Sequence, residues 1–383
     1  MTAAAPARPD CWGALDEAEV TGAVSAALGR PVRLAGFETT PVAYEPGSPA
    51  TGALVRVVGA TTGGQPWSLF LKVLQHPRHW PRLEHLPAEV RRLFLDRFPW
   101  RGELVAWEPG FADRLPDGLR LPRLHRLVEL GDDRVAVWME DVPTLDDAWD
   151  QARFASAARA LGGLAARRSD PALLAASPWP AGAGLRYYSR SRVEASGLPL
   201  LEEDGVWAHP LVAGAVDDRL RADLRTLGAR VPELLDGMDT LPQALPHGDA
   251  SPQNLLVPAD DPGTFVAIDV SFQTPHAVGF DLGQLLVGLV HAGQLPASSL
   301  PGIHAVLVPA FTDGLHAEGG QATPEEVNWG YVASLAVRAG FTSLPFERLG
   351  EPATPALAAT FRERAALTRF IADVALSLPS PSV

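Results

Sequence analysis

The chain of 383 residues has few residues of several types, and each scarcity excludes a class of protein. Cys11 is the only cysteine, so no disulfide and no cysteine-based metal site can form within one chain. No apolar run approaches the length of a membrane span, and the first residues lack the basic-then-apolar pattern of a signal peptide. We therefore expect a cytoplasmic protein without a membrane partner.

Positive charge is also scarce. The 32 basic residues are outnumbered by 45 acidic ones, and the formal net charge is −13. This balance argues against nucleic acid or an anionic membrane as a partner. The chain is nonetheless 46% hydrophobic and 20% charged, which is typical of a globular protein. Its 35 glycines and 36 prolines predict many short elements and loops.

Lysine and asparagine are almost missing. Lys72 is the single lysine among the basic residues, and Asn254 and Asn328 are the only asparagines. The composition favours alanine, glycine, proline and arginine. A lysine or asparagine that is retained against this bias is therefore more informative than usual.

The first part of the chain has the pattern of a small antiparallel sheet. A helix is predicted at 15–28, where acidic residues occupy the first turn and Gly29 follows the last. Residues 79–107 contain further helical patches. Short apolar runs between turns predict four strands, at Val32–Phe37, Ala53–Val58, Trp67–Leu74 and Arg134–Asp141.

After Pro143 the patterns become helical. The sequence predicts an irregular segment over 169–214 and a strand hairpin within 255–269. Helices are predicted at 145–168, 217–227, 280–291 and 323–338. We therefore expect an α+β protein with a β-rich lobe over 1–141 and a helical lobe over 142–383.

One short segment has the composition of a phosphoryl-transfer loop. Within 245–257, His247, Asp249 and Asn254 have the H-x-D-x4-N spacing of a kinase catalytic loop. Such a reaction needs a group that positions the attacking hydroxyl and oxygen ligands for Mg²⁺. Asp249 is suited to the first task, and the amide oxygen of Asn254 to the second.

Two further carboxylates follow in order. Asp269 ends an apolar strand of the predicted hairpin, which directs it to the same end as Asn254 and makes it a candidate second metal ligand. Asp281 opens an amphipathic helix. A single Asp in either position is more often a cap or a turn residue. The ordered set, from loop Asp to helix-opening Asp, favours a phosphotransferase.

The segment 245–286 resembles the aminoglycoside phosphotransferase family, the small-molecule relatives of protein kinases. Gly248 stands where protein kinases usually have Arg, which matches the small-molecule branch. The resemblance implies a bilobal protein-kinase-like fold that uses ATP and Mg²⁺. It implies that Asp249 is the catalytic base, that Asn254 and Asp269 bind Mg²⁺, and that His247 and Asp281 support the loop.

Lys72 lies on a predicted strand that resembles the family strand whose Lys binds the α- and β-phosphates. Alternation places Ser68, Phe70 and Lys72 on one face of this strand. Its partner should be a helical glutamate. Glu103 fits best, and Glu89 and then Glu84 are the alternatives.

Trp138-Met-Glu-Asp-Val142 resembles the family hinge, where the backbone groups of Glu140 and Val142 would bind adenine. Two features depart from the family. No G-x-G-x-x-G is present, and Gly47–Gly52 is the best candidate for a phosphate loop. Val270 replaces the Trp that often follows the metal-binding Asp.

These observations predict an ATP-dependent kinase for a hydroxyl of a small molecule such as an antibiotic, a sugar or a related metabolite. A kinase acting on Ser or Thr of a precursor peptide is the alternative enzyme. A catalytically inactive pseudokinase that serves as a binding module is the alternative from another class. Asp249, Asn254, Asp269 and Lys72 occur together, which counts against the pseudokinase. The acidic composition favours a neutral or cationic acceptor.

Overall fold

The computed structural model describes residues 16–42, 48–145, 149–270 and 273–380. The chain forms two compact units. The sheet unit comprises Met1–Pro109 and Leu121–Thr144, and the helical unit comprises Gly110–Arg120 and Leu145–Val383. The predicted division between residues 141 and 142 differs from this one mainly because Gly110–Arg120 packs with the helical unit.

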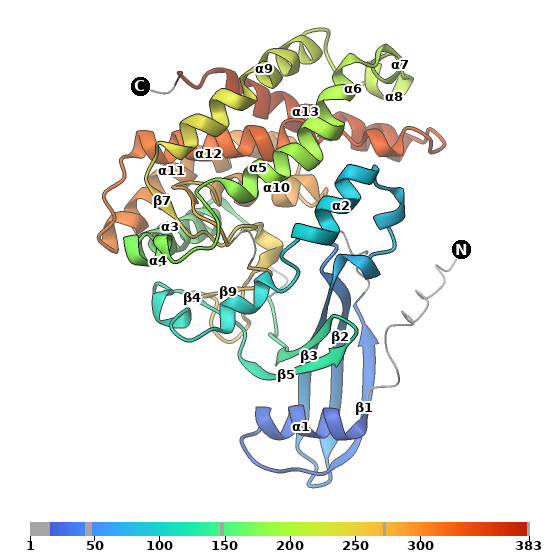
Figure 1. Cartoon of the computed structure of the whole chain (residues 1–383), viewed down its shortest axis with the longest axis vertical. Helices are drawn as coiled ribbons and strands as arrows, with labels where there is room; N and C mark the ends of the chain where they lie inside the picture. Colours follow the sequence, from blue (N-terminus) through green and yellow to red (C-terminus); the bar gives the residue numbers. More distant parts are fainter. Residues whose placement is uncertain (1–15, 43–47, 146–148, 271–272, 381–383) are drawn as a thin grey trace. The chain divides into compact units, whose positions relative to one another are not determined.

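Five strands of the sheet unit form one antiparallel sheet in the order β1-β2-β3-β6-β5 (Figure 1). Four of them match predicted strands. β5 was not predicted, because most of its residues are exposed and its sequence lacks an apolar face. The strands are β1 (Leu34–Pro41), β2 (Thr51–Thr61), β3 (Pro66–Gln75), β5 (Leu124–Gly131) and β6 (Arg134–Glu140).

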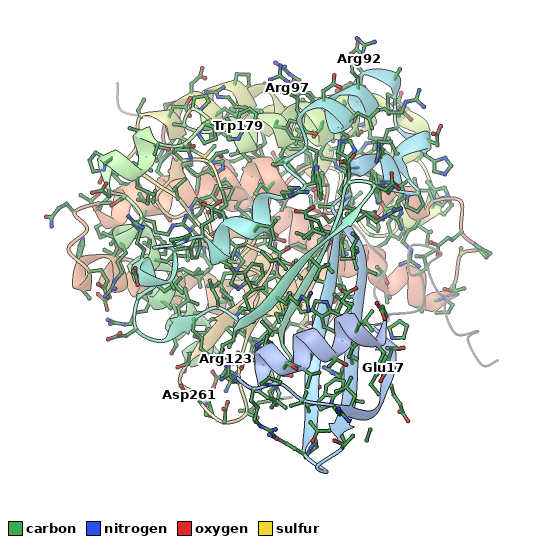
Figure 2. The ribbon with its side chains drawn as sticks, turned by 60° about the horizontal axis from the view of Figure 1, so that its bottom comes forward. Glu17, Arg92, Arg97, Arg123, Trp179 and Asp261 are labelled. Atoms are coloured by element: carbon green, nitrogen blue, oxygen red, sulfur yellow. The ribbon has the colours of Figure 1, made fainter. Side chains whose placement is uncertain are left out.

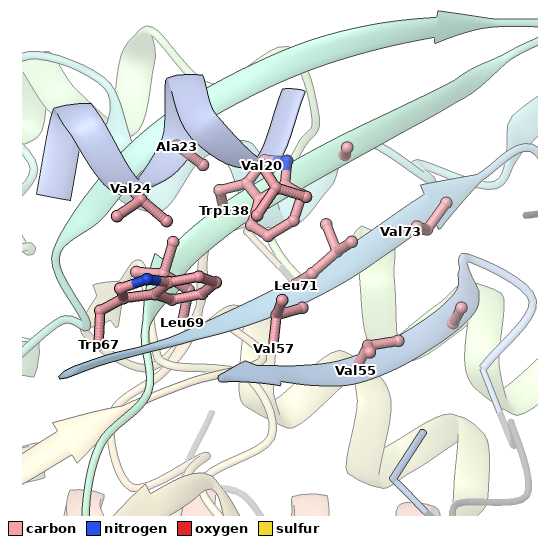
Figure 3. Close-up of a cluster of buried hydrophobic side chains, with 12 residues drawn as sticks. Val20, Ala23, Val24, Val55, Val57, Trp67, Leu69, Leu71, Val73 and Trp138 are labelled. Carbon is pink, nitrogen blue, oxygen red and sulfur yellow. The ribbon is translucent and has the colours of Figure 1, made fainter. Parts of the chain in front are cut away.

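Helix α1 (Glu17–Ala27) covers one face of this sheet (Figure 3). Its apolar side chains, such as Val20, belong to one buried cluster with Leu69, Leu71 and Val73 of β3. Side chains alternate along a strand, so Phe70 and Lys72 are placed on the opposite face. Phe70 indeed belongs to a second apolar cluster on that face.

The second face is lined by short helical segments. η3 (Gly102–Trp107) contributes Leu104 and Trp107, which pack with Phe70 and Met139. The nearby α2 (Ala88–Arg97) buries Phe94, while Arg92 and Arg97 are exposed and project from the helix (Figure 2). The remaining 3₁₀ turns of this unit are η1 (Pro77–His79) and η2 (Leu83–His85).

The helical unit has more helices than the sequence predicted. The expectation that 169–214 is irregular is wrong, because short helices separated by proline and glycine fill this segment. They are α4 (Pro171–Ala175), α5 (Ala183–Tyr188), the π-helix η5 (Ser189–Gly197), α6 (Leu198–Glu202), α7 (Asp204–Trp207) and α8 (Pro210–Ala213).

The longer helices form the rest of the unit. α11 and α13 were not predicted. The predicted helix at 145–168 is shorter, and its residues Asp146 and Asp147 lie outside the described residues. The helices are α3 (Gln151–Arg167), α9 (Leu220–Asp239), α10 (Leu282–His291), α11 (Leu300–Ala317), α12 (Pro324–Ala339) and α13 (Pro355–Leu376). None of the helices in the described ranges is long and apolar enough to cross a membrane.

Glycine allows α3 and α11 to pack closely. A Cβ added to Gly162 would lie 2.0 Å from the carbonyl oxygen of Phe311, and one added to Gly314 would lie 1.9 Å from that of Arg159. Only glycine fits at either position, because the atom that a Cβ would meet belongs to the backbone of the facing helix.

Short strands support the segment that carries the predicted catalytic loop. β8 (Leu255–Leu256) pairs antiparallel with β9 (Phe265–Ala267), which forms the predicted hairpin. β9 also pairs in parallel with β4 (Leu119–Arg120), which explains why Gly110–Arg120 belongs to the helical unit. β7 (Gln243–Ala244) and β10 (His276–Ala277) form a second short pair. The 3₁₀ turns η4 (Ala112–Arg114), η6 (Pro252–Asn254), η7 (Ala297–Ser299) and η8 (Phe346–Arg348) complete the unit.

Candidate active site

The loop between β7 and β8 is shaped by a glycine. Gly248 has a φ of 95°, in a region that side-chain-bearing residues rarely adopt. The loop then closes with η6, in which the N–H of Asn254 donates to the carbonyl of Ser251 (2.8 Å). This path brings the side chains of Asp249 and Asn254 together.

Asp281 supports the loop from the start of α10. Its carboxylate accepts hydrogen bonds from the N–H groups of His247 (2.9 Å) and Gly248 (2.8 Å), and only 4% of the residue is exposed. Burial raises the pKa of Asp281, while the positive charge that His247 can carry and the two N–H donors oppose that rise. The two bonds tie the loop backbone to α10.

His247 is almost fully buried, with 1% exposure. Burial lowers its pKa, so the ring is neutral at pH 7. Nδ1 accepts a hydrogen bond from the N–H of Asp249 (3.3 Å), which fits a neutral ring. His247 therefore contacts Asp249 through the backbone N–H of that residue.

Asp249 carries the carboxylate of this loop, and 40% of its side chain is exposed. Burial of the carboxylate raises its pKa, and Arg338 opposes the rise. Its Oδ1 lies 3.3 Å from Nη2 of Arg338, and Oδ2 accepts from Nδ2 of Asn254 (3.3 Å). The carboxylate is thus held at both oxygens and still reached by solvent.

Asn254 and Asp269 lie at the same end of the β8–β9 hairpin. The N–H of Ile268 donates to the carbonyl of Asn254 (3.0 Å), which places Asp269 next along the chain. Asp269 has a φ of 55°, a left-handed conformation that Asp tolerates better than most residues. Its charge contributes to raising the pKa of Asp249, so the two carboxylates interact.

The side-chain oxygen atoms of Asn254 and Asp269 suit a divalent cation that prefers oxygen ligands. Nδ2 of Asn254 donates to the carbonyl of Asp249 (2.8 Å), which turns the amide oxygen away from that residue. An amide oxygen and the carboxylate of Asp269 are the few protein ligands that Mg²⁺ needs when substrate phosphates and water complete its shell. No group of three or more His, Cys, Asp or Glu side chains suited to a metal occurs among the described residues.

In the sheet unit, Lys72 forms an ion pair with Glu103. Nζ lies 2.6 Å from Oε2, and only 7% of the Lys72 side chain and 14% of the Glu103 side chain are exposed. The two alternatives lie elsewhere: Glu84 is paired with Arg91, and Glu89 is exposed on α2. Of the three glutamates considered, the structure thus brings Glu103 to Lys72.

The predicted hinge residues follow β6. The N–H of Glu140 donates to the carbonyl of Arg123 (2.9 Å), so any backbone contact of Glu140 with a nucleotide is confined to its carbonyl. Val142 is buried. Between them, Asp141 accepts from Arg56 Nε (2.8 Å) and from the hydroxyl of Ser68. The predicted phosphate loop at 47–52 begins outside the described residues.

Sequence reasoning missed two arginines of the helical unit. Arg338, near the end of α12, contacts Asp249 and the carbonyl of Gly248. Arg168 follows α3 and donates to Gln273 (2.9 Å), which in turn donates to the carbonyl of Pro246 (2.9 Å). Burial lowers the pKa of Arg168 to about 10. Neither arginine could be identified from the sequence, because the chain has 31 arginines and no sequence pattern distinguishes these two from the others.

A groove of about 690 Å³ lies beside the close contact of α3 and α11. It is lined mostly by small side chains, such as those of Ala155, Ala160 and Ala310. No residue of 245–257 lines it, and neither Asp269 nor Asp281 does. The chemistry described above is therefore not located there.

Comparison with known proteins defines the class of the fold. No family model matches the sequence, and no curated sequence does. Among solved structures, the amicoumacin kinase hAmiN in complex with AMP-PNP and Ca²⁺ superposes with a TM-score of 0.52 at 14% identity. The alignment covers 94% of this chain and 93% of that one.

An aminoglycoside phosphotransferase from Alicyclobacillus acidocaldarius superposes with a TM-score of 0.50 at 13% identity, over 90% of this chain and 94% of that one. The chain therefore has the α+β, protein-kinase-like fold of these phosphotransferases. The resemblance inferred from the sequence and the predicted fold class are confirmed at the level of the fold.

Proposed function

We propose that this chain is an ATP-dependent phosphotransferase that phosphorylates a hydroxyl of a small molecule. The observation that carries the proposal is the arrangement around Asp249. An accessible carboxylate lies on a braced loop, with the amide of Asn254 against it and Asp269 at the same end of the β8–β9 hairpin as Asn254. Few functions other than phosphoryl transfer require this combination.

Asp249 positions the acceptor. Its carboxylate accepts a hydrogen bond from the acceptor hydroxyl and takes the proton as the hydroxyl oxygen attacks the γ-phosphorus of ATP. The bond from the γ-phosphorus to the β,γ-bridging oxygen breaks, and ADP leaves. Asn254 and Asp269 would hold Mg²⁺, which when bound neutralises phosphate charge.

The sheet unit supplies the nucleotide contacts. Lys72, oriented by Glu103, would contact the α- and β-phosphates, for which a compact ammonium is suited. The carbonyl of Glu140 and the N–H of Val142 would bind the edge of adenine. Phe70 and Met139 lie on the same face of the sheet as Lys72 and would offer apolar surface to the base.

Three observations support the proposed class of acceptor. The two structural relatives are an amicoumacin kinase and an aminoglycoside phosphotransferase, which are named for small-molecule acceptors. Gly248 matches the small-molecule branch. The net charge of −13 favours an acceptor that is neutral or cationic. A Ser or Thr peptide is the competing acceptor, and the pseudokinase binding module is the competing class.

A phosphorylation screen tests the proposal. The chain is incubated with Mg²⁺ and ATP, and with an aminoglycoside, a neutral glycoside, a Ser/Thr peptide or a sugar phosphate, and products are identified by mass spectrometry. Asp249→Asn is the matched control. Phosphorylation of a small molecule by the wild type alone supports the proposal. Phosphorylation of the peptide alone assigns the peptide kinase, and Mg·ATP binding without any turnover favours the pseudokinase.

A further inference from the structure

α12 carries a buried arginine to the catalytic loop. The side chain of Arg338 is only 7% exposed. Nη1 donates to the carbonyl of Gly248 (2.9 Å), and Nη2 lies 3.3 Å from Oδ1 of Asp249. The guanidinium carbon also lies 5.2 Å from the ring centroid of Phe280. One side chain therefore contacts both the loop backbone and the carboxylate that we assign as the base.

Burying a guanidinium requires compensation. Removing a charge from water is costly unless it is paired and hydrogen-bonded. Arg338 is paired with the carboxylate of Asp249, whose side chain is itself 40% exposed. The carbonyl of Gly248 and the face of the Phe280 ring compensate the buried guanidinium further. An arginine placed only for stability would be expected to pair with a buried or structural carboxylate. Asp281 is buried nearby and interacts with the charge of Arg338, but both of its carboxylate oxygens accept hydrogen bonds from the loop N–H groups.

The backbone that presents Arg338 is fixed by glycines. A Cβ added to Gly330 of α12 would lie 2.2 Å from the carbonyl oxygen of Val278. One added to Gly279 would lie 2.3 Å from the carbonyl oxygen of Val327. α12 therefore packs directly on the segment that leads into Asp281 and α10. The same segment thus sets the position of Asp281 and of the helix that carries Arg338.

The two oxygens of Asp249 have different neighbours. Oδ1 faces Arg338, and Oδ2 faces Nδ2 of Asn254. A planar guanidinium with two donors can fix the rotation of a carboxylate relative to the backbone that carries it. A lysine offers one donor group at a single point and would retain the charge without this geometric control.

We propose that Arg338 is a positioning residue for phosphoryl transfer, which fixes the Asp249 carboxylate in the orientation that receives the acceptor hydroxyl. This inference rests on the proposed function of Asp249. Arg338 acts through Asp249 and the Gly248 carbonyl, and it touches neither nucleotide nor acceptor in this role.

A double-mutant cycle tests the inference in the full chain. Turnover of Mg·ATP is measured with the acceptor found in the screen, or with water if none is found. The variants are Arg338→Met, Asp249→Asn and the two combined. We expect Arg338→Met to lower kcat about 100-fold, as for a misplaced catalytic group, with KM for ATP changed less than about threefold. In the Asp249→Asn background, the same change should cost less than about threefold, because the group it positions is already lost.

Arg338→Lys and Arg230→Met are the companion variants. Arg338→Lys keeps the charge but not the fork, and its kcat should lie between those of the wild type and Arg338→Met. Arg230 of α9 likewise donates to backbone carbonyls, but to those of Ala375 and Leu378 near the end of α13. Arg230→Met should lower the melting temperature and leave kcat within about twofold.

The outcomes separate the two hypotheses. If Arg338→Met lowers kcat by the same factor in both backgrounds, Arg338 does not position Asp249. If Arg338→Lys is as fast as the wild type, the positive charge alone is sufficient and the geometry of the guanidinium does not fix the carboxylate. If the wild type is active and Arg338→Met keeps its kcat, only the inference on Arg338 fails. If the wild type transfers no phosphate to any acceptor or to water, the proposed function fails and this inference with it.

Discussion

The two units hold their buried charges in different ways. In the sheet unit, Nζ of Lys72 lies 2.6 Å from the carboxylate of Glu103. In the helical unit, Asp249 belongs to a network, because Arg338, Asn254 and the backbone bound by Asp281 all determine its position. The contact of Lys72 with Glu103 concerns the cation proposed to bind the nucleotide, whereas the contacts of Asp249 concern the proposed base. The comparison predicts that substitutions in the two units change different kinetic constants.

The largest effect is expected from Asp249→Asn. The amide keeps the shape of the side chain but cannot accept the hydroxyl proton, so kcat should fall about 10²–10⁴-fold. The affinity for Mg·ATP, measured by calorimetry, should stay close to that of the wild type. A variant that retains more than about a tenth of the wild-type kcat on the true acceptor would show that Asp249 is not the base.

Asp269→Ala should have the next largest effect, on metal-dependent nucleotide binding. The substitution removes the one carboxylate of the proposed Mg²⁺ ligand set, so the gain in ATP affinity that Mg²⁺ confers should be lost. Calorimetry of ATP binding with and without Mg²⁺ measures it. Asp261→Ala is the matched control, because Asp261 is exposed in the turn of the same hairpin (Figure 2). An Asp269→Ala variant with the wild-type response to Mg²⁺ contradicts the assignment.

Glu103→Gln tests the pair of the sheet unit. The substitution removes the negative charge that lies 2.6 Å from Nζ of Lys72, in a site where only 7% of the Lys72 side chain is exposed. We expect KM for ATP to rise about tenfold, with a smaller change in kcat. Glu89→Gln is the control, since Glu89 is exposed on α2. Equal effects of the two substitutions on KM would remove Glu103 from the proposed nucleotide site.

Asp281→Ala should act mainly on stability. The substitution leaves the N–H groups of His247 and Gly248 buried without their acceptor, which costs about 1–3 kcal/mol of unfolding free energy. Thermal unfolding measures the loss, and Asp236→Ala at an exposed position of α9 is the control. If Asp281→Ala melts like the wild type but is inactive, Asp281 takes part in the chemistry instead of bracing the loop.

The sequence predicted the parts of the molecule whose residues are adjacent in the chain. The spacing within 245–257 is local, and the structure indeed brings Asp249 and Asn254 together. The alternation along β3 likewise placed Lys72 opposite the face that α1 covers. Each of these inferences depended only on the residue spacing within a single turn, strand or helix.

Contacts between distant segments could not be predicted. Arg338 lies 89 residues from Asp249, and nothing distinguishes it in a chain with so many arginines. The short helices of 169–214 were missed because their glycines and prolines resemble those of a loop, and tertiary packing decides their structure. The edge strand β5 was missed because its exposed residues carry no apolar pattern.

The smallest effect expected is a change in the pH dependence of stability at His276. This residue is 2% exposed, its ring stacks on Phe280 with centroids 4.1 Å apart, and Nε2 lies 2.9 Å from the hydroxyl of Thr274. Burial, and then the positive charge of Arg338, lower its pKa to about 3 from 6.5. Between these values the unfolded chain binds a proton that the folded chain excludes, so stability falls as the pH falls through this window.

Melting temperatures between about pH 7 and pH 4.5 should therefore decline less steeply in His276→Gln, which keeps a polar contact for Thr274 but cannot titrate. Part of the decline should remain, because burial also lowers the pKa values of His247 and His291. An unchanged slope in His276→Gln would mean that protonation of His276 does not oppose folding, and the helical unit would then tolerate a charge at this position beside Arg338.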